Sequence, residues 1–374
     1  MKTIFIYLIL LLNFSDLFSQ NIWKFITEIE NGPNNLVCSD SNNCFTTVQY
    51  YEHINQIQAI YKSENQGKTW YKLSAFETIN KNSDMSCPDS SNFFLTYKSS
   101  DTLYKSTNSG ADFTKISTGY GYNEYLSMFD NNIGVIATDR IKITKDGWES
   151  HKVFRIDSSF GKLLSYRNPI MLNDSLVIVT TGFNKMSYIM KLNINSLEYE
   201  LNTVEDYPYY SSDLTIINNS LLYICGWSHD IDGGSCRDAI YKSSDGGKNW
   251  RRVLDLYNDR KFNENFRNPF GLQQIAFKDS LTGIAVGQFG TIIYTYDGGE
   301  SWIYEKANPT DLKTPATMMV RYAGSVPIIV TFSGRIFRMI EDNLAPKPED
   351  TLSISGRVWD GDKGQTKYTD YNGL

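Results

Sequence analysis

The sequence predicts an all-β fold, a seven-bladed β-propeller of four-stranded antiparallel blades whose ring is closed by the N-terminal strand. Three observations support this. An octapeptide recurs, most clearly as SSDGGKNW at 243–250 and TYDGGESW at 295–302. A polar turn followed by an apolar strand recurs seven times, and a third strand follows each one. Over residues 21–340 the repeat averages about 46 residues, the size of a four-stranded blade.

The blade count rests on the turn-and-strand repeat. The seven units lie at 39–48, 89–96, 130–137, 173–179, 218–225, 279–287 and 323–330. The third strands follow at 56–61, 102–105, 140–144, 188–192, 239–242, 291–295 and 335–339. The units at 188–192 and 335–339 lack the octapeptide, so counting that motif alone would give too few blades.

The octapeptide falls between the third and fourth strands, where its chemistry suits a hairpin turn. Its Asp can accept backbone N–H groups, its Gly allows a positive φ, and its Trp can pack between neighbouring blades. Weaker copies occupy 63–70 and 106–113, and a shortened one occupies 144–148. We predict structural roles for Asn65, Asn108, Asp146, Asp245, Asp297, Trp70, Trp250 and Trp302. A metal site is not expected at these turns, because one carboxylate and glycines make no coordination shell.

The ends of the chain predict export and ring closure. Residues 1–19 have the pattern of a signal peptide, with Lys2 before an apolar run at 4–12. This run is too short to span the hydrocarbon core of a membrane as an anchor. The propeller is expected at 20–341. The last unit has three strands, and 22–26 resembles the fourth strand at 250–254, so we expect the two to pair and remove an exposed edge.

The C-terminal segment divides into two parts. Residues 342–352 have the composition of a linker, and 353–374 resemble the start of an immunoglobulin-like module. The tail is too short for a core of its own, so it is expected to be incomplete or disordered.

Five cysteines in an exported chain permit disulfides. Cys38 and Cys44 flank a turn and could meet across a hairpin. Cys225 and Cys236 flank a longer loop in the same manner, which leaves Cys87 over. The alternative is that all five are reduced and packed as small apolar side chains.

The octapeptide pattern S/T-x-D-x-G-x-x-W resembles the Asp-box, or BNR repeat, of sialidases, sortilin-type receptors and some glycoside hydrolases. The stretch 283–295, which continues into DGGESW, is similar to blades of photosystem II assembly-factor-type propellers, which recur in many exported bacterial proteins. The resemblance covers about residues 21–340. It implies the fold, whereas one fold hosts many functions.

Catalysis has weaker support in the sequence. A sialidase-like site would need three arginines, an acid/base Asp and a Tyr nucleophile beside a Glu. The Arg-Ile-Pro motif of sialidases has its nearest match at 154–157, FRID, where Pro is replaced. The histidines His53, His151 and His229 lack zinc spacing. Arginines that could form a triad are Arg140, Arg167, Arg237, Arg267 and Arg321. Whether the protein is an enzyme stays open.

Strand order predicts where a ligand would bind. The octapeptide turns and the first-to-second strand turns share one face of the disc. The second-to-third strand loops and the blade connections share the other, and this second face receives the aromatic insertions. The candidate ligand-binding residues are Trp227, His229, Arg237, Tyr207, Tyr209, Tyr210 and Tyr122, because aromatic rings on loops are favoured contact groups. Alternatively, these rings fill the channel or pack between blades.

We therefore expect a secreted, cell-surface or periplasmic protein that acts as a non-catalytic scaffold for a protein or glycan ligand. The alternatives are a sialidase-like glycoside hydrolase and an assembly factor for an envelope complex. The formal net charge of −6 disfavours nucleic acid as a partner. No cofactor, no metal and no membrane insertion after signal cleavage are expected, and the propeller is expected to be monomeric.

Overall fold

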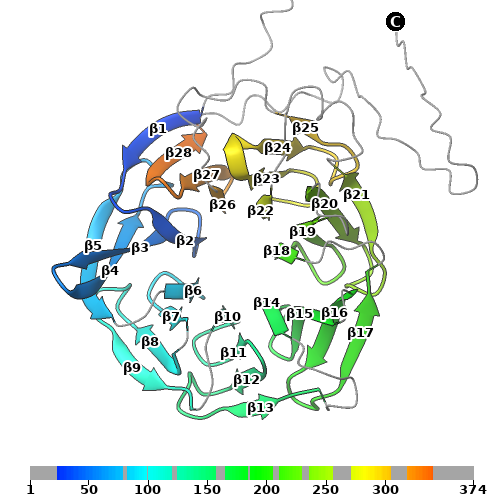
Figure 1. The fold of residues 1–374 in the computed structure, drawn as a ribbon, viewed down its shortest axis with the longest axis horizontal. Helices are drawn as coiled ribbons and strands as arrows, with labels where there is room; N and C mark the ends of the chain where they lie inside the picture. Colours follow the sequence, from blue (N-terminus) through cyan, green and yellow to red (C-terminus); the bar gives the residue numbers. More distant parts are fainter. Residues whose placement is uncertain are drawn as a thin grey trace, which may run out of the picture.

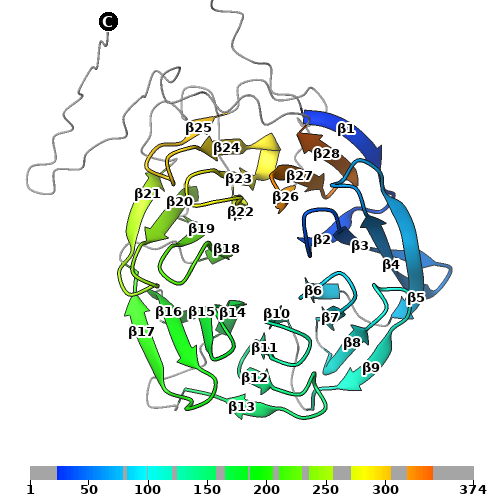
Figure 2. The same cartoon turned by 180° about the vertical axis from the view of Figure 1, so that it is seen from behind.

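Seven four-stranded antiparallel sheets surround a central axis (Figure 1), as predicted. The structure is a computed structural model that describes residues 23–78, 82–98, 100–119, 124–156, 165–183, 186–204, 210–229, 236–255, 271–304 and 318–339. The first strand of each blade faces the axis and the fourth lies at the rim, as both views of the ring show (Figure 2). The expected signal peptide (1–19), linker (342–352) and tail (353–374) lie outside the described residues.

We number the blades from the first one that is continuous in sequence. Blade 1 is β2 (Pro33–Cys38), β3 (Cys44–Glu52), β4 (Asn55–Ser63) and β5 (Tyr71–Thr78). Blade 2 is β6 (Asn82–Ser86), β7 (Phe93–Tyr97), β8 (Thr102–Ser106) and β9 (Thr114–Ser117). Blade 3 is β10 (Tyr125–Met128), β11 (Gly134–Ala137), β12 (Ile141–Thr144) and β13 (Lys152–Phe154). Blade 4 is β14 (Ser165–Met171), β15 (Leu176–Phe183), β16 (Met186–Asn193) and β17 (Tyr199–Thr203).

The remaining blades complete the ring. Blade 5 is β18 (Tyr210–Ile216), β19 (Leu222–His229), β20 (Cys236–Ser243) and β21 (Arg251–Asp255). Blade 6 is β22 (Leu272–Phe277), β23 (Gly283–Gly287), β24 (Ile292–Thr295) and β25 (Ile303–Tyr304), with the 3₁₀ turn η2 (Gln288–Gly290) after β23. Blade 7 is β26 (Met318–Ala323), β27 (Val326–Thr331), β28 (Arg335–Met339) and β1 (Trp23–Glu28).

The hydrophobic core lies between neighbouring blades. Middle strands such as β7 and β23 are buried along their whole length, because both faces pack against adjacent sheets. Between blades 1 and 2, for example, Phe45 and Phe93 meet edge to face with ring centroids 4.2 Å apart. Such edge-to-face aromatic pairs stabilise a core beyond the area they bury. Each blade thus depends on two neighbours, which explains why the ring must close.

The N-terminal strand closes the ring, as predicted. β1 pairs antiparallel with β28, and Trp23 lies opposite Met339. The Trp23 side chain is buried against Ile329 and Phe337 of blade 7, and its Nε1 donates a hydrogen bond to Tyr294 Oη of blade 6 at 2.7 Å. The two ends of the described chain are therefore held in one sheet, and that sheet is locked to its neighbour.

Each octapeptide turn is built from the same hydrogen bonds. In the turn at 243–250, the Ser243 hydroxyl donates to Asp245 Oδ1 at 2.9 Å and accepts the Gly247 N–H at 2.9 Å. Asp245 Oδ1 also accepts the Asn249 N–H at 2.9 Å. The turns at 63–70, 106–113, 144–151 and 295–302 repeat this pattern with Asn65, Asn108, Asp146 and Asp297 in the Asp245 position.

The third turn is full length, which differs from the shortened copy that the sequence suggested. Trp148 occupies the position that is Gly in the other four turns, and it adopts their left-handed conformation with φ 76°. Its buried indole donates to the Met128 sulfur at 3.2 Å. Burial of the ring thus offsets backbone strain on the order of 1–2 kcal/mol.

Lysines join the octapeptide turns to the preceding blade. Lys242 of β20 lies over the Tyr223 ring and donates to the Gly298 carbonyl of the next blade at 2.7 Å. Lys105 of β8 lies over Phe94 and donates to the Gly147 carbonyl at 3.1 Å. The octapeptide turns therefore act as joints between blades as well as turns within them.

Asparagine should replace aspartate in these turns at little cost, since Asn65 and Asn108 already make the same bonds. We expect Asp245→Ala to lower the free energy of unfolding by about 1 kcal/mol, because several turn hydrogen bonds lose their acceptor. Asp245→Asn should retain most of that stability. Urea unfolding of both variants at neutral pH checks this. Equal losses in the two variants would contradict the assigned bonding.

Candidate functional site

The two faces of the disc differ as the strand order requires. Octapeptide turns bond to the first-to-second strand turns of their own blades, for example Gly246 N–H to the Ser220 carbonyl and Gly298 N–H to the Leu281 carbonyl, both within 2.9 Å. We call this the octapeptide face. The opposite side, which carries the second-to-third strand turns and the blade connections, is called the loop face.

The predicted ligand residues lie in or near blade 5 and in the connection to blade 3. Tyr122, Tyr207 and Tyr209 lie outside the described residues. Tyr210 begins β18 opposite Trp227, whereas His229 and Arg237 lie opposite Cys236 and Ser228 in the β19–β20 hairpin. Tyr210, Trp227, His229 and Arg237 are therefore strand residues at the loop-face end of blade 5.

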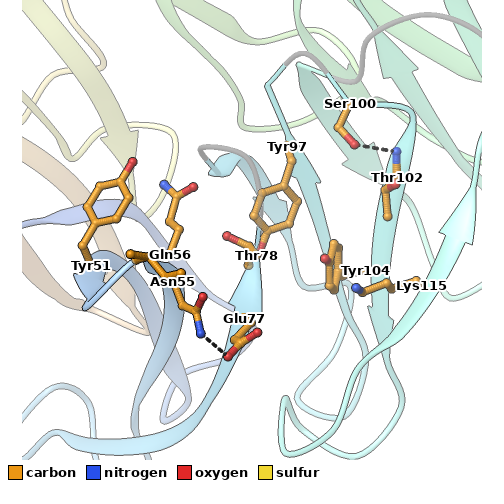
Figure 3. Close-up of a pocket in the computed structure, with 11 residues that line it drawn as sticks. Tyr51, Asn55, Gln56, Glu77, Thr78, Tyr97, Ser100, Thr102, Tyr104 and Lys115 are labelled. Atoms are coloured by element: carbon orange, nitrogen blue, oxygen red, sulfur yellow. Dashed lines mark hydrogen bonds between the residues drawn. The ribbon is translucent and has the colours of Figure 1, made fainter.

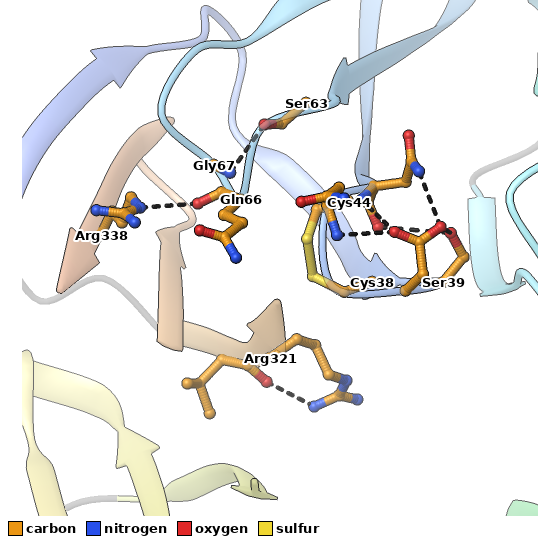
Figure 4. The surroundings of a disulfide bond; sticks show 12 residues. Cys38, Ser39, Cys44, Ser63, Gln66, Gly67, Arg321 and Arg338 are labelled. Carbon is orange, nitrogen blue, oxygen red and sulfur yellow. Dashed lines mark hydrogen bonds between the residues drawn. A yellow bond between two sulfur atoms is a disulfide. The ribbon is translucent and has the colours of Figure 1, made fainter. Parts of the chain in front are cut away.

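The structure contains one of the two disulfides considered. Cys38 and Cys44 form a bond that closes the β2–β3 turn (Figure 4), and Asp40 within that turn accepts the N–H groups of Asn42 and Asn43. These backbone hydrogen bonds, against the effect of burial, lower the pKa of Asp40.

The bridge expected between Cys225 and Cys236 is not formed. Cys225 is a buried free thiol, and the register places it opposite Ile240, whereas Cys236 lies opposite His229. The two cysteines are thus displaced from one another along the hairpin, beyond the span of a disulfide. Burial raises the pKa of Cys225 well above its usual value.

A pocket of about 440 Å³ opens at the boundary between blades 1 and 2 (Figure 3). It lies at the loop face, because the β3–β4 and β7–β8 turns contribute to it. We call it the tyrosine pocket; it is lined by Tyr51, Ile54, Asn55, Gln56, Glu77, Thr78, Tyr97, Ser100, Thr102, Tyr104 and Lys115.

The floor of the tyrosine pocket is a rigid pair of rings. Tyr97 and Tyr104 are buried, and their ring centroids are 4.8 Å apart. Tyr104 also stacks on Phe76 at 5.2 Å, and the Tyr97 hydroxyl donates to Gln58 Oε1 at 3.4 Å. Burial raises the pKa of Tyr97 well above its usual value, so its hydroxyl keeps its proton as a donor. These contacts fix the positions of the floor rings.

The rim of the pocket exposes apolar side chains on the β3–β4 hairpin. Tyr51 is 73% exposed and Ile54 is 93% exposed, the two highest values among the large hydrophobic side chains of the described chain. Asn55 Nδ2 donates to Glu77 Oε1 at 2.7 Å, which ties the hairpin to the outer strand β5. An anchored hairpin that presents Tyr and Ile to solvent is typical of a contact surface.

Sequence reasoning missed this pocket. Its residues come from β3–β4, β5, β7–β8 and β9, and only packing of two blades brings them together. The run YYEHIN at 50–55 was the available signal, because it places aromatic and apolar residues on a hairpin tip.

Polar groups on the inner strands are already engaged by neighbours. Arg321 of β26 donates to Gln274 Oε1 at 3.0 Å and to Asp213 Oδ2 at 3.3 Å. Asp84 of β6 accepts the Leu126 N–H at 2.8 Å, and burial raises the pKa of Asp84 to about 6. These bonds connect the blades around the axis.

Two arginines of the hydrolase alternative, Arg140 and Arg321, form ion pairs on different blades. Arg140 forms an ion pair with Asp139 at 2.7 Å, on the β11–β12 turn, and Arg321 is paired with Asp213. Arg155 also pairs with Asp139, at 2.9 Å. Arg140 and Arg321 are therefore each bound to a carboxylate of the protein. Within the described part of the chain, no three His, Cys, Asp or Glu side chains gather to hold a metal ion. No helix of the described residues is long and apolar enough to cross a membrane.

Fold and pocket together define the class of protein, a seven-bladed β-propeller with a ligand-sized pocket between two blades. No protein-family model matches the chain, and no curated protein matches it in sequence. Solved structures match the chain in fold. YCF48 bound to D1 peptide matches with a TM-score of 0.64 and 14% identity, over 88% of this chain and 98% of that chain.

Two further structures match over most of their length. YCF48 from Cyanidioschyzon merolae has a TM-score of 0.60 and 13% identity, over 85% of this chain and 98% of that one. The WD40 β-propeller domain of Doa1 has a TM-score of 0.55 and 11% identity, over 87% of this chain and 99% of that one. At these identities the likeness shows the propeller fold alone.

Proposed function

We propose that this protein is an exported, non-catalytic scaffold that binds another protein at the tyrosine pocket. The observation that carries the proposal is the combination of a rigid, ring-lined floor with an exposed Tyr51–Ile54 rim. Partners gain most of their binding free energy from a few aromatic contacts that become buried. A pocket that is formed in advance loses little conformational entropy when it binds.

The rim favours a protein partner over a glycan. A sugar could stack on the pocket rings and form hydrogen bonds with Asn55 or Gln56. A polar sugar would gain little, however, from contact with the apolar side chain of Ile54. A protein segment in the pocket, with its flanking residues on the rim, would cover both. One similar structure, YCF48, was solved with a peptide bound, which supports the same use of the fold here.

Export and family are part of the proposal. The signal-like segment at 1–19 predicts export, and the Cys38–Cys44 bond suits an oxidising compartment. The shared hydrogen bonds of the octapeptide turns support assigning them as Asp-boxes. A scaffold that binds a protein in the cell envelope is consistent with an assembly factor for an envelope complex, which is the second candidate.

Crosslinking at the rim tests the proposal. A photoreactive phenylalanine at Tyr51, in the cells that naturally make this chain, should capture a partner protein. The same group at Tyr199, an exposed tyrosine on the outer strand of blade 4, should not. Tyr51→Ala should then weaken binding of the purified partner by about ten-fold or more, because rim tyrosines are frequent hot spots, whereas Tyr199→Ala should not.

Two results would contradict the proposal. One is equal crosslinking at both positions. The other is tight binding to a glycan array that is lost with Tyr51→Ala while no protein is captured, and this would favour a lectin.

A further inference from the structure

The tyrosine pocket carries opposite charges on its two walls. Glu77 lies on β5 of blade 1, and Lys115 lies on β9 of blade 2, with the rings of Tyr97 and Tyr104 on the floor (Figure 3). No ion pair joins Glu77 to any lysine or arginine among the residues that the structure describes. The pocket thus has a negative pole and a positive pole that do not neutralise each other.

The Glu77 carboxylate has acceptor capacity to spare. Its side chain is exposed, and Asn55 Nδ2 donates to Oε1 at 2.7 Å. An ionised carboxylate offers about four lone-pair sites, so one neutral amide leaves most of them for a ligand. Asn55 also sets the position of the carboxylate at the pocket mouth, which lowers the entropic cost of a further bond.

Lys115 lies against an aromatic ring of the pocket floor. Its Nζ lies over Tyr104, 5.5 Å from the ring centroid, a cation–π distance. This contact shows that the floor rings attract a cation. Among the residues that the structure describes, Lys115 therefore pairs with a ring, and Glu77 forms no ion pair.

We propose that the pocket selects its protein partner through an arginine or lysine side chain that pairs with Glu77. The methylene stem of that side chain packs on Tyr51, and its charged end reaches the carboxylate beside Asn55. Long basic side chains combine these two properties, an apolar stem and a charged head. The net charge of −6 favours approach of a basic segment. This inference rests on the proposed function.

Variants that neutralise the charge on one wall of the pocket test the inference. Short random peptides displayed on phage are selected on the wild-type protein, and the enriched peptides should contain an arginine or lysine. Binding of one fluorescent enriched peptide is then measured by anisotropy. Glu77→Gln, which keeps the shape and an acceptor for Asn55, should weaken binding by about ten-fold. Replacing the basic residue of the peptide by glutamine should cost the same, and the two changes together should cost little more than either one.

Lys115→Gln is the matched control on the opposite wall. It should leave binding of the basic peptide unchanged or tighten it, because it removes a like charge. Enrichment of acidic peptides that lose affinity with Lys115→Gln would overturn the inference. Unchanged affinity in Glu77→Gln would overturn it as well, and if Tyr51→Ala still abolished binding, the proposed function would stand without it. If the wild-type protein enriched no peptide relative to the Tyr51→Ala protein, both the inference and the proposed function would be rejected.

Discussion

Replacing Trp23 by alanine should lower the free energy of unfolding by about 3–5 kcal/mol, the usual cost of truncating a buried aromatic residue. Trp23 is 6% exposed and fills space between β28 and blade 6. The substitution also leaves the Tyr294 hydroxyl without the indole donor at 2.7 Å. Because β1 is the fourth strand of blade 7, loosening it exposes the edge of β28 and weakens the pairing that closes the ring.

The control for Trp23→Ala is a second aromatic residue on the same strand, β1. Phe25 is 44% exposed and lies edge to face with Phe337 at 5.8 Å, so Phe25→Ala should cost clearly less than Trp23→Ala. Urea unfolding followed by circular dichroism gives both values. If the two variants lost equal stability, or if Trp23→Ala were neutral, the closing strand would contribute little to the stability of the ring.

The stability of the fold should decrease between about pH 4 and pH 7 because of Asp238. This side chain is 1% exposed, and Asp238 Oδ1 accepts the Leu272 N–H across the boundary of blades 5 and 6 at 2.9 Å. Burial raises the pKa of Asp238 to about 7, although backbone hydrogen bonds oppose the shift. The folded protein therefore keeps this proton up to about pH 7, whereas the unfolded chain releases it near its usual pKa of 3.8.

The direction in which the free energy of unfolding changes with pH follows from these two pKa values. The contribution of Asp238 to stability is complete below the unfolded pKa, and it is lost as the pH rises through the folded pKa. The loss amounts to at most roughly 4 kcal/mol, since each pKa unit corresponds to about 1.4 kcal/mol. Asp238→Asn removes the titration, so the free energy of unfolding of the wild type should fall relative to this variant from pH 4 to pH 7.

Urea unfolding of both proteins across this range measures the difference. Asp245→Asn is the control of opposite sign, because the Asn249 N–H and its companions lower the pKa of Asp245 to about 2. Because Asp245 is exposed and solvent screens its charge, the wild type should gain only a small amount of stability over Asp245→Asn as the pH rises from about 2 to 4, and the two should change in parallel above that range. A flat difference for Asp238→Asn would mean that its carboxyl ionises in the folded protein as it does in water.

Local chemistry was readable from the sequence. The octapeptide turns are built from hydrogen bonds between residues two to four positions apart. A motif of eight consecutive residues is therefore enough to predict them. The Cys38–Cys44 bond spans one hairpin turn. Where the outcome depended on register, the prediction failed: the displacement of Cys225 from Cys236 comes from the pairing of β19 with β20, which spacing in the sequence does not reveal.

The sequence by itself determined the all-β class, the number of blades and the closing strand. The class and the number follow from the regular spacing of polar turns and apolar strands. The closing strand follows because the last repeat has only three strands and a segment like a fourth strand precedes the first repeat. Only the tertiary structure formed the tyrosine pocket, where we propose that a partner binds. Tyr51, Glu77, Tyr97 and Lys115 lie far apart in the chain and belong to two blades. They share one pocket because burial of the rings between blades 1 and 2 brings them together, and no local pattern encodes that packing.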